Sequence, residues 1–504
     1  MTARLPSFRI KATLVVWLSA AGDVLLWQAT GVGANLGVFG LAIVLAVGVA
    51  SPAIRRHPLA LAALLAAALL AALQIERATL VGWISFTLAL AVAALAPRAP
   101  SGQDGWRWAQ RLLMGGLKGL SGPVLDLRDV MRARTRKAPL RVAAIAFGAI
   151  LPVVGGMTFL CLFAVANPVI SEALRAWRLP EPDMSRAMFW VVVAVPAWGL
   201  LRPRGLRRTI GTSGLDGELD LPGVTTASIA ISLGLFNLIF ALQNGLDLAF
   251  LWNGAGLPDG VTFADYAHRG AYPLIATALL AGLFVIVFLR PGSRSAADRR
   301  VRLLVIAWVA QNLFLVASTA LRTIDYIDVY SLTRVRIAAL IWMGLVALGL
   351  VLILWRMLRA KSTSWLINTN LLAVGLVLAT CSAADLGAFA AAWNVRHLPS
   401  AARRGVELDL CYFDQLKGAG IVSLAQLEQT LPAGDPRDRV AWKRRSLSAE
   451  VARQQSEWRT WRWRDARRLA RVAALTGETP VFPAGASRRC DGSAPLTPTP
   501  NPGT

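Results

Sequence analysis

Arginines, aspartates and tyrosines gather in one short segment, RTIDYIDVYSLTRVRI (322–337), which lies between two long apolar runs. Guanidinium groups pair with carboxylates, and phenol hydroxyls both donate and accept hydrogen bonds. If the segment is helical, residues four apart share one face. Because no Gly or Pro interrupts residues 322–343, we expect the segment to extend the apolar helix that follows it. Its chemistry-bearing members are Arg322, Asp325, Tyr326, Asp328, Tyr330, Arg334 and Arg336.

A polar stripe interrupts the apolar run over residues 226–252. At 100° per residue on a helix, its polar side chains fall within an arc of about 120°. A carboxylate inside a membrane is costly and normally faces protein, water or an opposite charge. Two interpretations stay open: the stripe bonds one helix to another, or it lines a polar cavity. Its members are Asn237, Gln243, Asn244 and Asp247.

The expected depth of Asp247 connects these two groups. The run that holds it is expected to point outward, so Asp247 lies level with the start of the 322–337 segment, whose arginines are the nearest abundant cations on that side. We therefore expect an outward-facing, water-filled polar site. The segment DGVTFADYAHRGAY (259–272) would add Tyr266 and Arg269 to it. Two further intramembrane acids, Asp23 and Asp385, are expected near the same depth in other runs.

The apolar runs themselves indicate a membrane protein. An apolar helix of about 20 residues crosses the hydrocarbon core of a bilayer, and many of these runs are apolar on all sides, as in LALAALLAAALLAAL (59–73). We predict an all-α, polytopic integral membrane protein with about eleven transmembrane helices and a small helical C-terminal domain. The expected spans are 12–29, 34–53, 58–74, 78–96, 141–166, 186–201, 226–252, 271–290, 303–321, 336–358 and 365–385.

Basic residues alternate between the links that join these runs. The N-terminal tail and every second link are rich in Arg and Lys, whereas the intervening links are short, neutral or mixed in charge. Because basic links remain in the cytoplasm, we expect a cytoplasmic N-terminus and, after an odd number of spans, a periplasmic C-terminus. The same rule accounts for much of the net charge of +24. The sequence carries no nucleic-acid-binding motif, so we expect no nucleic-acid partner. The Ala-, Arg- and Trp-rich composition suggests a GC-rich bacterial genome, and we expect the protein in the bacterial inner membrane.

The expected domain boundaries follow from these patterns. Residues 1–97 would form a four-span membrane region, 98–140 a basic cytoplasmic link, and 141–397 a seven-span membrane region. Residues 398–478 are expected to form the small basic domain, and 479–504 a disordered tail. In a periplasmic domain, Cys411 and Cys490 could form a disulfide.

Tryptophan and arginine crowd the last predicted helix of that domain, which we expect to run unbroken to Gly477. Trp458, Trp461 and Arg464 lie near its middle. Such a helix suits an anionic lipid surface or an envelope protein, or else its tryptophans pack inside the domain and its arginines face solvent. Both interpretations stay open.

Catalytic motifs are missing from the sequence. It has no phosphate-binding loop, no His-Glu-x-x-His and no Cys-x-x-Cys, and GTSGL (211–215) lacks the full Gly-x-Ser-x-Gly pattern. The histidines, His57, His268 and His397, are too dispersed to propose a metal site. We expect no metal and no cofactor, and a membrane enzyme stays only as a third, weaker option.

Several stretches together carry a family resemblance: AAGDVLLWQATGVGANLGVF (20–39), FNLIFALQNGLDLAFLW (236–252), RTIDYIDVYSLTRVRIAALIWM (322–343), LDLCYFDQLKGAG (408–420) and WRTWRWRDARRLA (458–470). They resemble a family of multi-pass bacterial membrane proteins catalogued as domain of unknown function 4173, with a relative numbered 4153. Ser331 stands where we expect the family's glycine, in a Tyr-Gly-Leu-Thr turn. The resemblance spans most of the chain and implies a membrane architecture without an assigned activity.

Two functions remain open at this point. In the first, the protein moves or binds a small solute at the outward-facing polar site. In the second, it is a non-enzymatic envelope sensor, scaffold or assembly partner. The polar stripe favours the first slightly, whereas the lack of an inverted repeat and of paired broken helices counts against a transporter. Beyond the lipid bilayer, the expected partner is an envelope protein or anionic lipid at the Trp- and Arg-rich helix. The sequence carries no signal for an oligomeric state.

Overall fold

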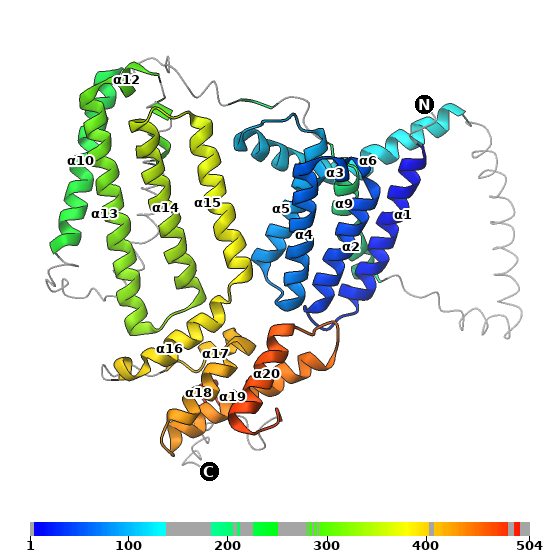
Figure 1. The fold of residues 1–504 in the computed structure, drawn as a ribbon, viewed down its shortest axis with the longest axis vertical. Helices are drawn as coiled ribbons and strands as arrows, with labels where there is room; N and C mark the ends of the chain where they lie inside the picture. The colour runs from blue at the N-terminus through cyan, green and yellow to red at the C-terminus, as the bar shows by residue number, and fades with distance from the viewer. Residues whose placement is uncertain are drawn as a thin grey trace, which may run out of the picture.

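The computed structural model describes residues 5–137, 183–204, 209–211, 225–249, 292–402, 408–481 and 488–493, and parts of 280–290. Every regular element in these residues is a helix, and 8 of the helices are long and apolar enough to cross a membrane. The predicted class, an all-α polytopic membrane protein, is confirmed. Figure 1 shows the long helices side by side, with a smaller helical domain beneath one end of them.

The first group of membrane helices packs around one apolar core. It comprises α1 (Leu5–Gly22), which continues as a π-helical turn (Asp23–Trp27), the shorter α2 (Ala34–Ala50), α4 (Pro58–Glu76), α5 (Leu80–Leu95) and α9 (Met184–Leu201). Leu18, Phe86 and Leu90 are fully buried in the core, and Ala197 of α9 joins them. Helix α9 therefore belongs with the first helices of the chain, whereas we expected its residues in the second membrane region.

The second group contains α10 (Thr226–Asp247), α13 (Arg299–Tyr330), α14 (Arg334–Leu358) and α15 (Thr363–Ala383). Its core is built on Leu233, Val305 and Trp308. Helix α15 also contacts α5 of the first group, where the hydroxyls of Ser85 and Ser382 lie 3.4 Å apart. The expected span 141–166 and most of the expected span 271–290 lie outside the described residues.

The described helices end at two opposite faces of the molecule (Figure 1). We call the face with α3 (Pro52–Arg56), α6 and α12 (Arg294–Ala297) the basic face, because arginines cluster in these links. The opposite face carries the turn from α4 to α5, the turn from α13 to α14, and the C-terminal domain, and we call it the domain face.

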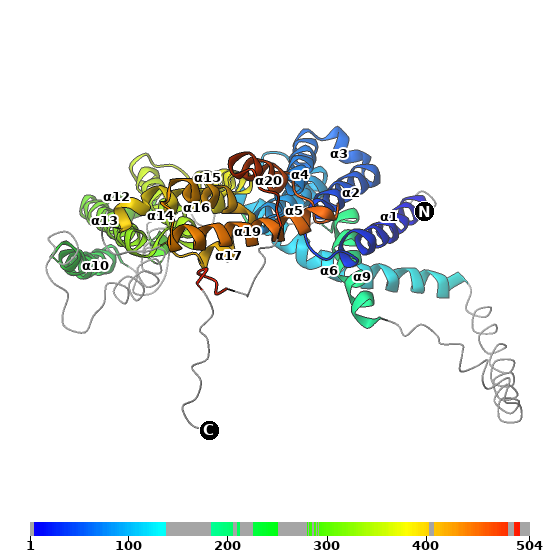
Figure 2. The same cartoon turned by 90° about the horizontal axis from the view of Figure 1, so that it is seen from below.

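The expected basic link at 98–140 is largely one long helix, α6 (Gly105–Lys137), which lies across the basic face (Figures 1 and 2). Asp126 attaches it to α9, because its carboxylate accepts hydrogen bonds from the Trp198 indole and the Arg204 guanidinium, each at 2.8 Å. An apolar stripe of α6 is exposed, as expected for an amphipathic helix at a membrane surface. The stripe consists of Leu113, Leu117, Leu120 and Val124.

The C-terminal domain has its own apolar core, in which Phe413, Ile421 and Leu424 are fully buried. Its helices are α16 (Leu386–Ala402), α17 (Tyr412–Leu416), α18 (Ile421–Thr430), α19 (Asp435–Ser456) and α20 (Trp463–Thr476). The expectation of one unbroken helix up to Gly477 is wrong. Helix α19 ends at Ser456, and residues 457–462 contact the start of α2 instead of continuing the helix.

The turn between α13 and α14 corrects a second expectation. Residues 322–330 extend α13, the helix before them, and not α14, because the helix stops at Ser331. Ser331 has φ 68° and ψ 163°, a conformation that glycine adopts far more readily than other residues. The Asn394 side chain holds the turn by accepting a hydrogen bond from the Leu332 amide at 2.7 Å and donating one to its carbonyl at 3.0 Å.

Replacement of Ser331 by glycine should stabilise the protein. Ser331→Gly removes a backbone strain of about 1 kcal/mol, and we expect the free energy of unfolding in detergent to rise by about that amount. As a control, Ser121→Gly in the middle of α6 should lower it by roughly 0.5 kcal/mol, because glycine has a lower helix propensity than serine. A loss of stability in Ser331→Gly would contradict the strained-turn interpretation.

Candidate functional site

The polar stripe of α10 faces α13 and forms hydrogen bonds to it, beside the apolar contacts of Leu233 with the core. The Asn237 amide donates to the Leu304 carbonyl at 3.0 Å and accepts from the Gln311 side chain at 2.8 Å. About two turns further along the helix, the Asn244 side-chain amide donates to the Gln311 carbonyl at 3.1 Å. These bonds favour the first interpretation of the stripe for its amides, which is that they join two membrane helices.

At the end of the stripe, Asp247 meets Arg322. The Arg322 guanidinium forms an ion pair with the Asp247 carboxylate, which also accepts a hydrogen bond from the Gln243 side chain at 3.0 Å. The Asp247 side chain is fully buried, and that of Arg322 is 6% exposed. We call Asp247 and Arg322 the polar pair. Two opposite charges buried together offset much of each other's desolvation cost, which either charge alone would carry in full.

The polar pair lies near the domain-face boundary of the membrane. Helix α10 rises about 32 Å from Thr226 to Asp247, and α13 about 35 Å from Arg299 to Arg322, at 1.5 Å per residue. Both lengths match the ~30 Å hydrocarbon core. With 32 residues, α13 is longer than the membrane is thick, so its last turns extend past the polar pair.

Those last turns of α13 carry an aromatic cluster. The Tyr326 and Tyr330 rings pack at a tilt of 39° with their centroids 4.6 Å apart, and the Arg336 guanidinium lies 4.3 Å from the centre of the Tyr326 ring. Arg336 also donates to the Tyr330 carbonyl at 2.6 Å. Arg336 therefore closes the α13–α14 turn as a cation over a phenol ring, a favourable arrangement.

The predicted members at 325, 328 and 334, which the structure does describe, lie away from the polar pair. Arg334 points to the C-terminal domain, where its guanidinium donates to the Gln415 carbonyl at 3.3 Å and its amide to the Tyr412 hydroxyl at 2.8 Å. Asp325 and Asp328 occupy exposed positions of α13. Tyr266 and Arg269 lie outside the described residues.

The intramembrane acid of the first group, Asp23, binds side chains of a neighbouring helix, α9. Its carboxylate accepts hydrogen bonds from Arg186 at 2.7 and 2.5 Å and from the Trp190 indole at 2.9 Å, both on α9. The Gln28 side chain adds a further bond at 3.2 Å. Asp23 is 6% exposed, so this cluster holds α1 to α9 near the domain face.

Asp385 and Glu76 form a charged cluster at the domain face with arginines from two parts of the chain. Arg464 lies 2.7 Å from Glu76 and 3.5 Å from Asp385, so one side chain bridges both acids. Because Glu76 ends α4 and Asp385 follows α15, the C-terminal domain is bound to both membrane groups at once. We call this cluster the interdomain clamp, and its members are Glu76, Arg77, Asp385, Arg464, Arg467 and Arg468.

The clamp holds Asp385 in its charged form. Burial by itself would raise the pKa of this carboxyl, but the positive charges of Arg468, Arg77 and Arg464 and the Ala388 amide together bring the pKa below its ordinary value. The Asp385 carboxylate also caps the start of α16, because it accepts a hydrogen bond from the Ala388 amide at 3.0 Å. The clamp therefore orients α16 as well as α20.

Beside the clamp, the backbone at the start of α2 contacts the backbone of residues 457–462 directly. The amides of Ala34 and Asn35 donate to the carbonyls of Trp461 and Arg459 at 2.7 and 3.0 Å. A Cβ atom on Gly33 would lie 2.3 Å from the Thr460 carbonyl, so only glycine fits at this approach. The break in the predicted helix at 457–462 therefore serves to bind the start of α2.

Most arginines of the Trp- and Arg-rich segment (458–468) form ion pairs with acids of the same chain. Arg464 and Arg468 are largely covered by the clamp, with 21% and 14% of their side chains exposed. Trp458 and Trp463 remain exposed, as does Arg467, whose guanidinium stands 6.0 Å from the centre of the Trp463 ring. These exposed residues are the part of the 458–468 segment that stays available to a lipid surface or a partner.

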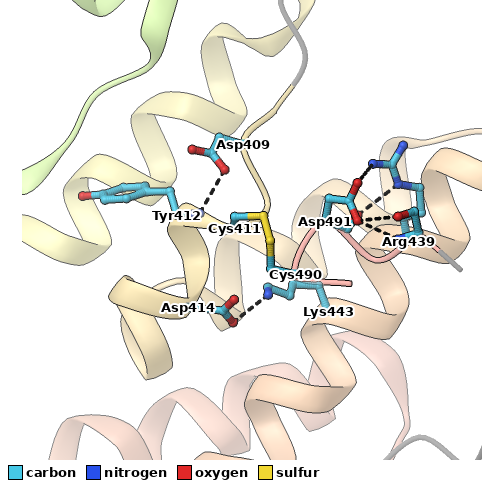
Figure 3. The surroundings of a disulfide bond; sticks show 9 residues. Asp409, Cys411, Tyr412, Asp414, Arg439, Lys443, Cys490 and Asp491 are labelled. Carbon is cyan, nitrogen blue, oxygen red and sulfur yellow. Dashed lines mark hydrogen bonds and ion pairs between the residues drawn. A yellow bond between two sulfur atoms is a disulfide. The ribbon is translucent and has the colours of Figure 1, made fainter. Parts of the chain in front are cut away.

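A disulfide between Cys411 and Cys490 closes the C-terminal domain, with the two Cα atoms 4.8 Å apart (Figure 3). Lys443 of α19 donates to Asp414 at 2.6 Å beside it, and the Arg439 guanidinium donates to the Asp491 carboxylate at 3.2 Å. Residues 488–493 are therefore held against α19, although they belong to the segment that we expected to be disordered.

Sequence reasoning missed several residues that the site depends on. Glu76, Arg77 and Arg186 sit in short links or at helix ends, where a charged residue is ordinary, so their types carried no signal. The spacing of Arg464 and Arg468, four residues apart on one helix, was a usable sign of a shared acidic partner. In the described residues no group of three or more His, Cys, Asp or Glu side chains could hold a metal ion.

A double-mutant cycle should reveal the polar pair. Asp247→Asn leaves Arg322 buried without its counter-charge, and we expect a loss of about 3 kcal/mol in the free energy of unfolding. Adding Arg322→Gln should recover at least 1 kcal/mol of this loss, measured by unfolding in detergent.

The neighbouring arginines supply the matched controls for this cycle. Arg336→Gln and Arg334→Gln remove the same charge from the same segment, but these residues contact Tyr326 and the C-terminal domain. Each should combine with Asp247→Asn additively, within about 0.5 kcal/mol. Additive behaviour of Arg322→Gln as well would show that the pair does not couple in the membrane protein.

Comparison with known proteins places the chain in a family. The family model described as "Domain of unknown function (DUF4153)" matches residues 59–427, which is the greater part of the chain. The matched range includes the first membrane group from α4 onward, the second membrane group and the clamp acids. This is the relative that the sequence resemblance named beside family 4173. No curated protein and no solved structure matches the chain. The chain, a multi-pass helical membrane protein, belongs to the DUF4153 family.

Proposed function

We propose that the protein presents its disulfide-closed C-terminal domain on the outer face of a bacterial inner membrane and acts there as a non-enzymatic scaffold or sensor of the envelope. The interdomain clamp carries this proposal. It joins the domain to α4 of the first membrane group and to the α15–α16 junction of the second by ion pairs of 2.7 to 3.5 Å. A domain bound at two separated points reports, or imposes, the relative position of the two groups.

The distribution of charge supports this orientation. The basic face carries arginines at the ends of α3, α5, α9 and α14, and basic links stay in the cytoplasm. The domain lies at the opposite face (Figure 1). Although the domain is itself basic, long segments cross the membrane largely regardless of their charge.

The disulfide supports the same compartment. Disulfides persist in the oxidising periplasm and are rare in the reducing cytoplasm. Cys411 and Cys490 are 79 residues apart, so their bond closes a long loop around the domain core. A bond of this kind stabilises a small domain by about 2–4 kcal/mol, provided that the domain resides where the bond can form.

The polar pair supports a second candidate function, the binding of a small solute. A buried Asp–Arg pair is weak evidence of stabilisation alone, and ionisable residues at membrane depth often mark a ligand path. The pair lies at the domain-face boundary, where a polar solute from outside would arrive first. Hydrogen bonds of side-chain amides join α10 to α13, and they count against a continuous route for a solute between these two helices. Solute binding therefore fits better than transport.

Orientation can be measured with reporter fusions and thiol labelling. Alkaline phosphatase, which is active only outside the cytoplasm, should be active when fused after residues 330 and 420 and silent after 140 and 224. In the denatured full-length protein, Cys411 and Cys490 should react with maleimide only after reduction, while Cys381, which is a free thiol, reacts without it. Activity at 140, or free thiols at 411 and 490, would refute the periplasmic domain.

A complementation assay separates the two candidate functions. In a host lacking the protein, growth is compared under osmotic and envelope stress with variants of equal membrane abundance. We expect Glu76→Gln with Asp385→Asn, which opens the clamp, to fail, and Asp247→Asn with Arg322→Gln, which neutralises the polar pair, to support growth. The control Asp435→Asn changes a carboxylate that is 79% exposed. Growth with the open clamp and failure without the polar pair would favour solute binding and contradict the scaffold.

A further inference from the structure

A cavity of about 290 Å³ lies at the basic face, between α12, the start of α13 and the end of α14. It is far larger than the roughly 30 Å³ share of one water molecule. It is at the small end of the range for ligand pockets, so it suits a compact group and not a large metabolite. Small residues shape its wall, among them Gly292, Ser293 and Ala296.

Two arginines give this cavity its charge. Arg302 of α13 and Arg356 of α14 both line it, and the described lining contains no acidic residue. Arg356 is 3% exposed, and its guanidinium donates to the Thr363 hydroxyl at 2.8 Å, which holds the side chain in place. Guanidinium groups bind phosphate oxygens with paired hydrogen bonds, so two of them in one small cavity favour a phosphate group.

The position of the cavity indicates which molecule could supply that phosphate group. Arg356 lies in the last turn of α14 and Arg302 in the first turn of α13, so both stand where the membrane helices leave the hydrocarbon core. That level is occupied by lipid headgroups. Basic pockets between membrane helices on the cytoplasmic side are suited to anionic headgroups.

We propose that the cavity lined by Arg302 and Arg356 binds a phosphate group, supplied by the headgroup of an anionic phospholipid of the inner leaflet. The site stands on the opposite face from the C-terminal domain, and it rests on the proposed function only for the orientation of the basic face toward the cytoplasm. The bound headgroup would bridge α13 and α14 at the end where the α13–α14 turn does not connect them. It would therefore stabilise the second membrane group from the basic face.

The proposal can be tested by lipid binding to the purified full-length protein in detergent, with native mass spectrometry and thermal unfolding as readouts. The probes are phosphatidylglycerol, phosphatidylcholine and inorganic phosphate. We expect phosphatidylglycerol to be retained and to raise the unfolding temperature more than phosphatidylcholine does. Arg302→Gln should weaken phosphatidylglycerol binding about tenfold, because it removes one charge-assisted contact.

Two further variants separate the cavity from general surface charge. Ala296→Leu fills the cavity while keeping both arginines, and it should also abolish retention. Arg300→Gln removes the same charge from an exposed position on the same helix turn and should leave binding unchanged. Binding of inorganic phosphate with the same dependence on variants would assign the site to a soluble phosphate instead of a lipid. Equal retention of both lipids, or equal losses in Arg300→Gln and Arg302→Gln, would overturn the proposal.

Discussion

The pairing of buried carboxylates with arginines organises this protein. Asp23 meets Arg186, Asp126 meets Arg204, Asp247 meets Arg322, and Asp385 meets Arg468. Each pair joins two parts of the chain that are distant in sequence. In the low-dielectric surroundings of a membrane, a lone carboxylate is costly, so each acid selects the helix that brings it a cation. The choice of neighbours among otherwise similar apolar helices depends on this constraint, because lipid tails are as apolar as the helices themselves.

The same constraint explains how the C-terminal domain relates to the membrane groups. Within the domain, Arg445 and Arg444 pair with Glu478 and lower the pKa of this carboxyl to about 2. These ion pairs join α19 to the end of the domain after α20. Toward the membrane, its remaining arginines meet Glu76 and Asp385. Ion pairs therefore have two roles in this domain. Those within it join its helices, and those of the clamp set its position over both membrane groups.

Long apolar runs were enough to predict the class of the protein and the approximate limits of its described spans. The reason is that backbone groups in a lipid core must bond within their own helix, so length and hydropathy determine the element. Prediction failed at the helix breaks. Ser331 stops α13 in a conformation that its residue type disfavours, and residues 457–462 interrupt an apparently continuous helix to bind α2. Both breaks depend on contacts with distant residues, which local propensity does not contain.

For the candidate site, the sequence by itself determined that Asp247 needed a counter-charge and that the arginines of 322–336 were the nearest source, because depth in a membrane follows from position along a helix. Only the tertiary structure decided which arginine serves. A helix of 3.6 residues per turn directs Arg322 toward α10, while the stop at Ser331 redirects Arg334 to the C-terminal domain and Arg336 over Tyr326. The spacing of these arginines is local information, but the direction each one takes depends on where the helix ends and on what packs against it.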